Sequence, residues 1–161
     1  RPMKRRGGTM IEMVAVITVL LGVTGIAIPL LGNDAGSKLG AAAMMLRDDL
    51  EQVRYRTLAD PSNPLALVLD ENGRGWRITS LQDMTAPIER HDGGDWSVTF
   101  GEDRAAGFQG VRIEADTEIV WFDARGVLGL DDKPTIRLSL EERRRSLDIG
   151  LVTGLIRISS P

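Results

Sequence analysis

The chain has 161 residues, of which 42% are hydrophobic and 27% are charged, and its formal net charge is −3. These proportions are typical of one folded domain with a further segment attached to it. The absence of cysteine excludes disulfides, thiolate zinc sites and thiol nucleophiles, and the acidic balance argues against general nucleic-acid binding.

The N-terminal part of the chain joins a basic cluster to a long apolar run. Residues 13–31 are 19 residues without a charge, and as a helix they would extend about 28 Å, close to the roughly 30 Å core of a bilayer. The basic residues that precede this run are Arg1, Lys4, Arg5 and Arg6. They predict a membrane span with a cytoplasmic N-terminus and residues 32–161 outside. The alternative is a secretory signal peptide, whose apolar core is shorter.

Residues 7–12, with the sequence Gly-Gly-Thr-Met-Ile-Glu, resemble the signal of type IV prepilins and pseudopilins. In that signal a short basic leader ends in glycine, and a threonine and a glutamate precede the apolar helix. The resemblance implies cleavage between Gly7 and Gly8 by a prepilin peptidase, followed by N-methylation of Gly8. Gly8 departs from the Phe or Met usual in the family. Pro29 stands where the family often carries a helix-bending proline.

Glu12 is a single acid at the head of the apolar run. An ionised carboxylate near lipid normally needs a partner. The resemblance implies that, in a fibre, Glu12 pairs with the new α-amino group of Gly8 on a neighbouring subunit. Such pairing offsets most of the cost of burying the charge, so it would set subunit register more than it stabilises the fibre. The alternative is a carboxylate in the headgroup zone beside Lys4 and Arg5.

Residues 37–59 predict an amphipathic helix. Its apolar residues recur at steps of three and four, at Leu39, Ala43, Leu46, Leu50 and Val53. The polar residues, Asp49 and Arg54 among them, are expected on the other faces. Two glycines and an asparagine within residues 32–36 predict a bent or frayed junction with the apolar run. Pro61 ends the helix.

From residue 65 onward the pattern changes to short strands. Residues 65–70 and 75–80 flank Asn72-Gly73, which is typical of a hairpin turn. Further strands are expected at 96–100, 111–115, 118–122, 135–140, 146–151 and 155–159, with loops at 81–95 and 101–110. Short strands joined by tight turns predict an α+β fold, in which one face of an antiparallel sheet is covered by the helix.

The C-terminal half contains two stretches that are similar to the GspH/FimT family of minor pseudopilins. Ile119 to Gly126 is an apolar strand followed by Phe, Asp and, three residues later, Gly. Thr153 to Ile158 resembles the closing strand of the family, which usually ends in Gly-Arg-apolar-Arg. Leu155 replaces the first arginine of that pattern and Arg157 keeps the second. The resemblance implies a type IV pilin-like fold, with a long N-terminal helix packed on an antiparallel β-sheet domain.

We find no pattern that predicts catalysis. His91 is the one histidine, and with Asp92 and Ser97 it would form a triad only if the three met in space, so a solvated loop is favoured. Asp123 and residues 131–132 could bind calcium, but no EF-hand spacing is present and turn-forming roles are favoured. We therefore expect no enzymatic activity, no metal and no cofactor.

A basic run offers one candidate nucleic-acid patch. Some FimT-like minor pilins are implicated in DNA uptake through a basic C-terminal region, and the matching residues would be Arg143, Arg144, Arg145 and Arg157. Two acids, Glu141 and Glu142, adjoin the run. Removal of residues 1–7, which carry four basic and no acidic side chains, would also change the net charge from −3 to −7. We therefore favour a solvated turn between strands and do not expect nucleic-acid binding.

These observations predict the organisation of the chain. It comprises a leader peptide (1–7), a transmembrane and assembly helix (8–31), an amphipathic helical half with a linker (32–64) and a globular β-rich domain (65–161). The resemblance implies a minor pseudopilin of a type II secretion system, in a periplasmic pseudopilus that drives exoprotein export. The alternatives are a minor type IV pilin in pilus assembly or DNA uptake, and a membrane-anchored periplasmic enzyme or binding domain.

The resemblance also implies partners and a location. The partners are a prepilin peptidase, other pseudopilins or pilins, an inner-membrane assembly platform, and membrane lipid before assembly. The location is the inner membrane, crossed once, with the C-terminal domain in the periplasm.

Overall fold

The structure is a computed structural model that describes residues 13–14, 16–18 and 35–159. The chain divides into two units, Arg1–Asp34 and Ala35–Pro161. In the first unit the described residues are helical, and the Thr18 hydroxyl donates a hydrogen bond to the Val14 carbonyl at 2.8 Å. Among the described residues, no helix combines the length and the apolar character that a membrane crossing requires. Most of the predicted span lies outside those residues.

The second unit begins with helix α2, Ala35–Ala59. The apolar residues that predicted this helix are all buried, namely Leu39, Ala43, Leu46, Leu50 and Val53. Ala42 is buried beside them. The amide of Asp60 bonds to the carbonyl of Arg56 at 2.9 Å, and Pro61 then prevents a further turn. The prediction of a helix over 37–59 is confirmed, with a start two residues earlier.

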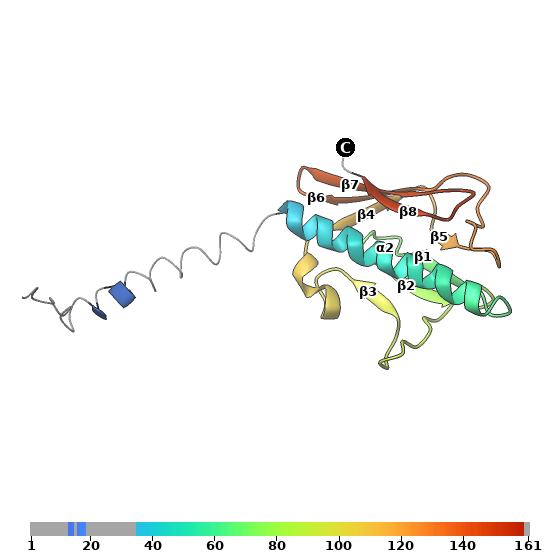
Figure 1. Ribbon diagram of the computed structural model, residues 1–161, viewed down its shortest axis with the longest axis horizontal. Helices are drawn as coiled ribbons and strands as arrows, with labels where there is room; N and C mark the ends of the chain where they lie inside the picture. Colours follow the sequence, from blue (N-terminus) through green and yellow to red (C-terminus); the bar gives the residue numbers. More distant parts are fainter. Residues whose placement is uncertain (1–12, 15, 19–34, 160–161) are drawn as a thin grey trace, which may run out of the picture. The chain divides into compact units, whose positions relative to one another are not determined.

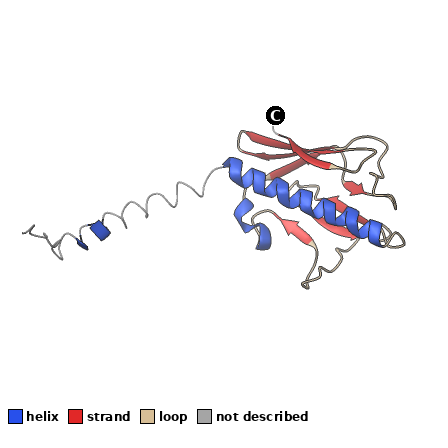
Figure 2. Ribbon diagram, viewed as in Figure 1, coloured by secondary structure: helices blue, strands red, loops and turns tan. Residues whose placement is uncertain are grey.

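Within residues 35–159 the helix is followed by eight strands, which form two antiparallel sheets (Figures 1 and 2). The first sheet has the order β3-β2-β1-β5 and consists of β1 (Leu65–Leu69), β2 (Gly75–Ser80), β3 (Ser97–Thr99) and β5 (Ile119–Trp121). The second sheet has the order β4-β6-β7-β8 and consists of β4 (Arg112–Ala115), β6 (Thr135–Leu140), β7 (Arg143–Ile149) and β8 (Ile156–Ser159).

Helix α2 packs on both sheets, which corrects the expectation of one sheet. The core between them contains Trp76 and Val120 from the first sheet and Leu138 and Ile149 from the second, none more than 1% exposed. Trp76 also contacts the ring of Phe100 edge to face, with 5.6 Å between centroids. The strand alternation marks which side chains point inward, but it does not say which distant strands pair, so the number of sheets was not predictable from it.

One predicted hairpin is confirmed, whereas a predicted loop and the start of one strand differ from the predictions. The Asn72-Gly73 hairpin forms as predicted, with Gly73 at φ 65°, and this glycine lies so close to β4 that a Cβ would be 2.4 Å from the Ile113 carbonyl oxygen. A 3₁₀ helix, η1 (Asp103–Phe108), stands where a loop was expected. Strand β7 begins at Arg143, three residues before the predicted start.

Candidate functional site

The residues predicted to direct processing and assembly lie outside the described part of the chain. They are Gly7, Gly8, Glu12 and Pro29, and their roles stay predictions. The described helical residues next to them are apolar and exposed, with Met13 at 70% and Val14 at 59%. These side chains are therefore available to lipid or to another helix.

Helix α2 presents an exposed stripe on the side away from the two sheets. Met44 is 60% exposed and Tyr55 is 70% exposed. They are separated by three turns of 3.6 residues, so they lie on the same side of the helix. The polar residues Asp48 and Gln52 lie between them and are also exposed. We call Met44, Asp48, Gln52 and Tyr55 the outer stripe of α2. A stripe of this mixed character can pack against a neighbouring element without being costly in water.

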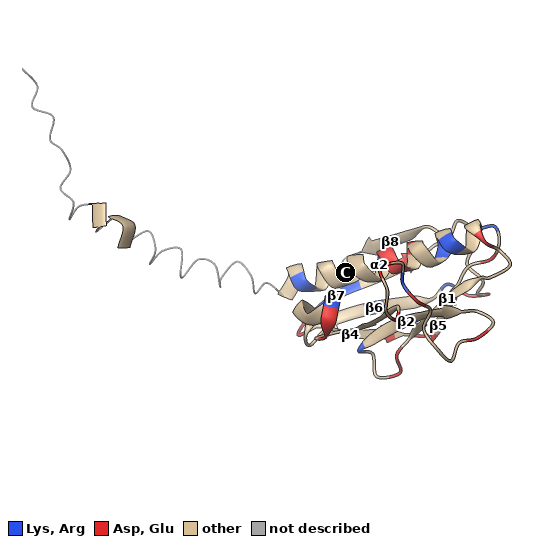
Figure 3. Cartoon of the chain, turned by 90° about the horizontal axis from the view of Figure 1, so that it is seen from below, with Lys and Arg blue, Asp and Glu red and all other residues tan. Residues whose placement is uncertain are grey.

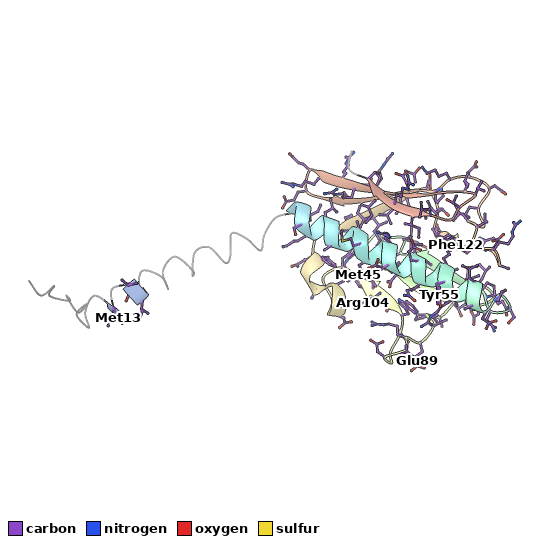
Figure 4. The ribbon with its side chains drawn as sticks, viewed as in Figure 1. Met13, Met45, Tyr55, Glu89, Arg104 and Phe122 are labelled. Atoms are coloured by element: carbon purple, nitrogen blue, oxygen red, sulfur yellow. The ribbon has the colours of Figure 1, made fainter. Side chains whose placement is uncertain are left out.

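Asp49 forms a buried polar hub beneath α2. Its side chain accepts hydrogen bonds from Trp76 Nε1 at 2.8 Å, from Trp96 Nε1 at 3.3 Å and from the Arg104 guanidinium at 2.5 Å. Asp49 is 6% exposed, and Figure 4 shows Arg104 on the short helix η1 beside α2. A buried carboxylate is tolerated when it is paired and hydrogen-bonded. The hub therefore ties α2 to β2, to η1 and to the segment before β3.

The expectation that Asp49 lies on a polar face is wrong. Its partners come from segments 27, 47 and 55 residues away, and the sequence gives no local sign of them. One signal was present, because Asp49 stands three residues after Leu46 and four before Val53, within the apolar spacing of the helix.

Arg54 links α2 to two turns of the C-terminal half. Its Nε donates to the Gly126 carbonyl and its second guanidinium nitrogen to the Thr153 carbonyl, both at 2.9 Å. Gly154 has φ 59°, and a Cβ there would lie 2.2 Å from the Gly126 carbonyl oxygen. Figure 3 shows that α2 carries both basic and acidic residues. Arg54 is thus a basic residue of the helix with a structural role, which sequence reasoning missed.

Of the candidate calcium and triad residues, Asp123 and Asp92 make local contacts. The Asp123 carboxylate accepts hydrogen bonds from the amides of Arg125 and Val127, both at 2.9 Å. The Val127 amide is the main reason why the pKa of Asp123 is lowered from its ordinary value. Asp92 pairs with Arg90 at 2.6 Å, whereas His91 is exposed in a turn. In the described residues, no group of three acidic, histidine or cysteine side chains is arranged to hold a metal ion.

The basic run is part of β7, not of a turn, which corrects the favoured interpretation. The turn between β6 and β7 consists of Glu141 and Glu142. Along β7 the side chains alternate between faces. Arg143 and Arg145 share the face of the buried Leu147, whereas Arg144 points to the opposite face.

The outer face of the second sheet therefore collects a different set of basic residues. The cross-strand register places Arg112 and Arg144 in one row through Ser139, and Arg157 beside Asp148 in another. The exposed arginines of this face are Arg112, Arg137, Arg144 and Arg157. Two carboxylates, Glu114 and Asp148, interrupt them, and Asp148 is paired with Lys133 at 2.8 Å. Two of the four candidate nucleic-acid residues, Arg144 and Arg157, thus share a face, while Arg143 and Arg145 do not join them.

Comparison with known proteins yields structural matches alone. No family model and no curated protein matches the sequence. Two crystal structures of the type IV minor pilin FimU from Pseudomonas aeruginosa are similar to it. The match in space group P65 has a TM-score of 0.54 and 19% identity, and it covers 76% of this chain and 97% of the chain in that crystal structure. The match in space group P21 has a TM-score of 0.53 and 19% identity, and it covers 78% of this chain and 89% of the chain in that crystal structure.

At this level of identity the comparison establishes the fold. The α+β, type IV pilin-like fold predicted from the sequence is confirmed, with α2 packed on antiparallel β-structure.

Proposed function

We propose that this chain is a minor pseudopilin, a structural subunit of the periplasmic fibre of a type II secretion system. The observation that carries this proposal is a pilin-like fold in residues 35–159 that directly follows a prepilin-like signal and an apolar run. The GspH/FimT-like stretches of the C-terminal half favour the secretion fibre over other pilin assemblies.

The proposed cycle begins in the inner membrane. A prepilin peptidase removes residues 1–7 and the new N-terminus at Gly8 is methylated. An assembly platform then moves the subunit from lipid into the fibre, where residues 9–31 pack against neighbouring helices and a separate cytoplasmic ATPase supplies the energy. The outer stripe of α2 is free of the two sheets of its own domain, so it is available to a neighbouring subunit. The domain has no proposed catalytic role.

A second candidate is a minor pilin of a type IV pilus. The two structural matches are to FimU, a minor pilin of that kind, and this observation favours the candidate. The two candidates share processing, membrane storage and helix packing. They differ in the assembly to which the subunit belongs, which is a type II secretion fibre in one case and a type IV pilus in the other.

Deletion of the gene in the native host separates the two candidates. Loss of exoenzyme secretion with normal twitching and transformation supports the pseudopilin, and the reverse pattern supports the type IV pilin. Mass spectrometry of the mature chain tests what they share. We expect an N-methylated start at Gly8 that disappears in a strain without the prepilin peptidase. An intact leader, or a mature start beyond Leu31, would contradict both candidates.

A further inference from the structure

A groove runs along β5 on the outer side of the first sheet. Its volume is about 490 Å³, and its apolar lining comes from Leu81, Met84, Ile119, Trp121 and Leu130. All five side chains are partly exposed. We call this hollow the β5 groove. Its lining comes from β5, from the loop after β2 and from the segment before β6, so the fold assembles it from three parts of the chain.

Trp121 is held in a fixed orientation within this groove. A Cβ on Gly129 would lie 2.4 Å from the indole ring, so the ring lies directly against the glycine backbone. Trp121 pairs with Ala66 in the sheet register, and Ala66 is fully buried. One side of the indole therefore rests on the protein, and the exposed remainder is a preformed apolar and aromatic surface. Such a surface binds at a lower entropic cost than a mobile side chain.

The backbone of β5 at the groove is occupied within the chain. The Trp121 carbonyl accepts a hydrogen bond from the Gly129 amide at 2.9 Å. The Ile119 carbonyl accepts one from the Thr117 hydroxyl at 3.0 Å. Addition of a further strand at this edge would have to break these bonds. A partner is therefore expected to use side chains against the groove.

The rim of the groove is acidic. Asp116 and Glu118 line it and are exposed. An adjoining hollow of about 390 Å³ shares Asp116 and Leu130 with the groove and adds Asp131 and Asp132. A hydrogen bond from the Thr135 amide is the main cause that lowers the pKa of Asp116, so this carboxylate keeps its charge into acid.

Lys133 and Arg137 are basic residues of the described chain near these carboxylates. Lys133 lines the adjoining hollow but pairs with Asp148 at 2.8 Å, on the outer face of the second sheet. Arg137 pairs with Glu114 in the register of β4 and β6, next to the end of β4 after which Asp116 follows. The carboxylates around the groove and the adjoining hollow are those of Asp116, Glu118, Asp131 and Asp132. They outnumber the two cations, so the net charge of the rim is negative.

We propose that the β5 groove binds a segment of a partner protein in which apolar residues are interspersed with lysine or arginine. The apolar side chains would contact Leu81, Met84 and Trp121, and the cations would lie beside Asp116 and Glu118 or over the indole. The charge of the rim selects this occupant over an acidic or neutral one. This inference goes beyond the proposed function and does not depend on fibre assembly.

Binding of short synthetic peptides to the full chain tests the proposal. The chain is placed in nanodiscs of zwitterionic lipid, with empty nanodiscs as the blank. The probe is a blocked pentapeptide of alternating lysine and leucine, and its comparators replace lysine by glutamate or leucine by serine. Trp76 and Trp96 are buried at 1% and 6% exposure, so a change in tryptophan emission on binding reports on Trp121. We expect the lysine–leucine peptide to bind about tenfold or more tightly than either comparator, and to weaken in high salt.

Charge-reversal variants locate the site. Glu118→Lys should weaken binding about tenfold, whereas Glu142→Lys, in the exposed turn between β6 and β7, should leave it unchanged. A photo-reactive leucine in the peptide should cross-link to the loop at Met84 or to β5. Equal binding of the three peptides, or equal behaviour of the two variants, would overturn the proposal. Self-association that Glu118→Lys abolishes, without peptide binding, would instead assign the groove to a second copy. Fibre assembly is measured separately, so either result leaves the proposed function to its own test.

Discussion

Asp49 connects α2 to three separate segments through one buried carboxylate. Two indole N–H groups and a guanidinium converge on it, and each is buried or partly buried. Arg56, two turns further along α2, lies over the Trp96 ring at 4.6 Å from its centroid. Polar groups in a buried network of this kind are costly to leave without a partner, because the local dielectric is low. Removal of the acceptor therefore affects all of its donors at once.

Asp49→Ala should lower the free energy of unfolding by about 2–4 kcal/mol, because it leaves a partly buried cation and two indole donors without their acceptor. Denaturant unfolding of the full chain in detergent, followed by tryptophan emission, measures the change. Asp48→Ala is the matched control, because Asp48 is the exposed neighbour and should change stability by less than about 0.5 kcal/mol. Equal effects of the two substitutions would show that the hub contributes nothing.

At the scale of the element, α2 contains a glycine that its conformation does not require. Nothing lies within 4 Å of the position that a Cβ on Gly40 would occupy, and the residue stands inside the helix. Gly154 is the opposite case, with a positive φ and the Gly126 carbonyl oxygen in the way. The same added methyl group therefore has opposite consequences at the two positions.

Gly40→Ala should raise the free energy of unfolding by about 0.5–1 kcal/mol, since alanine loses less backbone entropy in a helix. Gly154→Ala should lower it by more than about 1 kcal/mol, because it strains the turn that Arg54 fixes. Both variants can be compared with the parent chain by thermal unfolding. A loss of stability in Gly40→Ala would contradict the open space around this position.

At the scale of the whole molecule, the acidic side chains predict a loss of stability in acid. Hydrogen bonds lower the pKa of five aspartates from their ordinary value of 3.8, namely Asp60, Asp83, Asp116, Asp123 and Asp148. A lowered pKa contributes stability above the unfolded value, and this contribution is lost as pH falls through the folded value. Burial raises the pKa of Asp70, so that residue acts in the opposite direction and offsets a small part.

The free energy of unfolding should therefore be flat near neutral pH and fall between about pH 5 and pH 2. Denaturant midpoints measured across this range would show the fall. Asp123→Asn should make it less steep, because the amide oxygen can still accept the Val127 bond but no longer titrates. A stability that rises on acidification would mean that burial, as at Asp70, governs the carboxylates.

Assembly gives a further prediction at the scale of the whole molecule. On the processing and pairing proposed for this chain, Glu12→Ala should leave cleavage after Gly7 intact and reduce incorporation into the fibre about tenfold or more, because the Gly8 ammonium of the neighbouring subunit would lose its partner. Immunoblots of sheared fibres and of membranes from the native host measure both steps. Normal incorporation of the variant would refute the pairing role, and Glu12→Asp provides a control that keeps the charge.

The sequence by itself determined the local elements of this protein. The spacing of Leu39, Leu46 and Val53 marks the buried face of α2 because a helix repeats every 3.6 residues. Asn72-Gly73 sets the first hairpin because Gly73 adopts a positive φ without strain. The α+β class follows from such patterns, since each of them depends on neighbours within a few residues.

Only the tertiary structure decided how these elements meet. The division into two sheets, the burial of Asp49 and the groove beside Trp121 all depend on pairings between residues far apart in the chain. A strand pattern states which residues share a face, but the partner strand and its register are fixed by long-range packing. The outer face of the second sheet and the β5 groove therefore form only when the strands have paired and packed with α2.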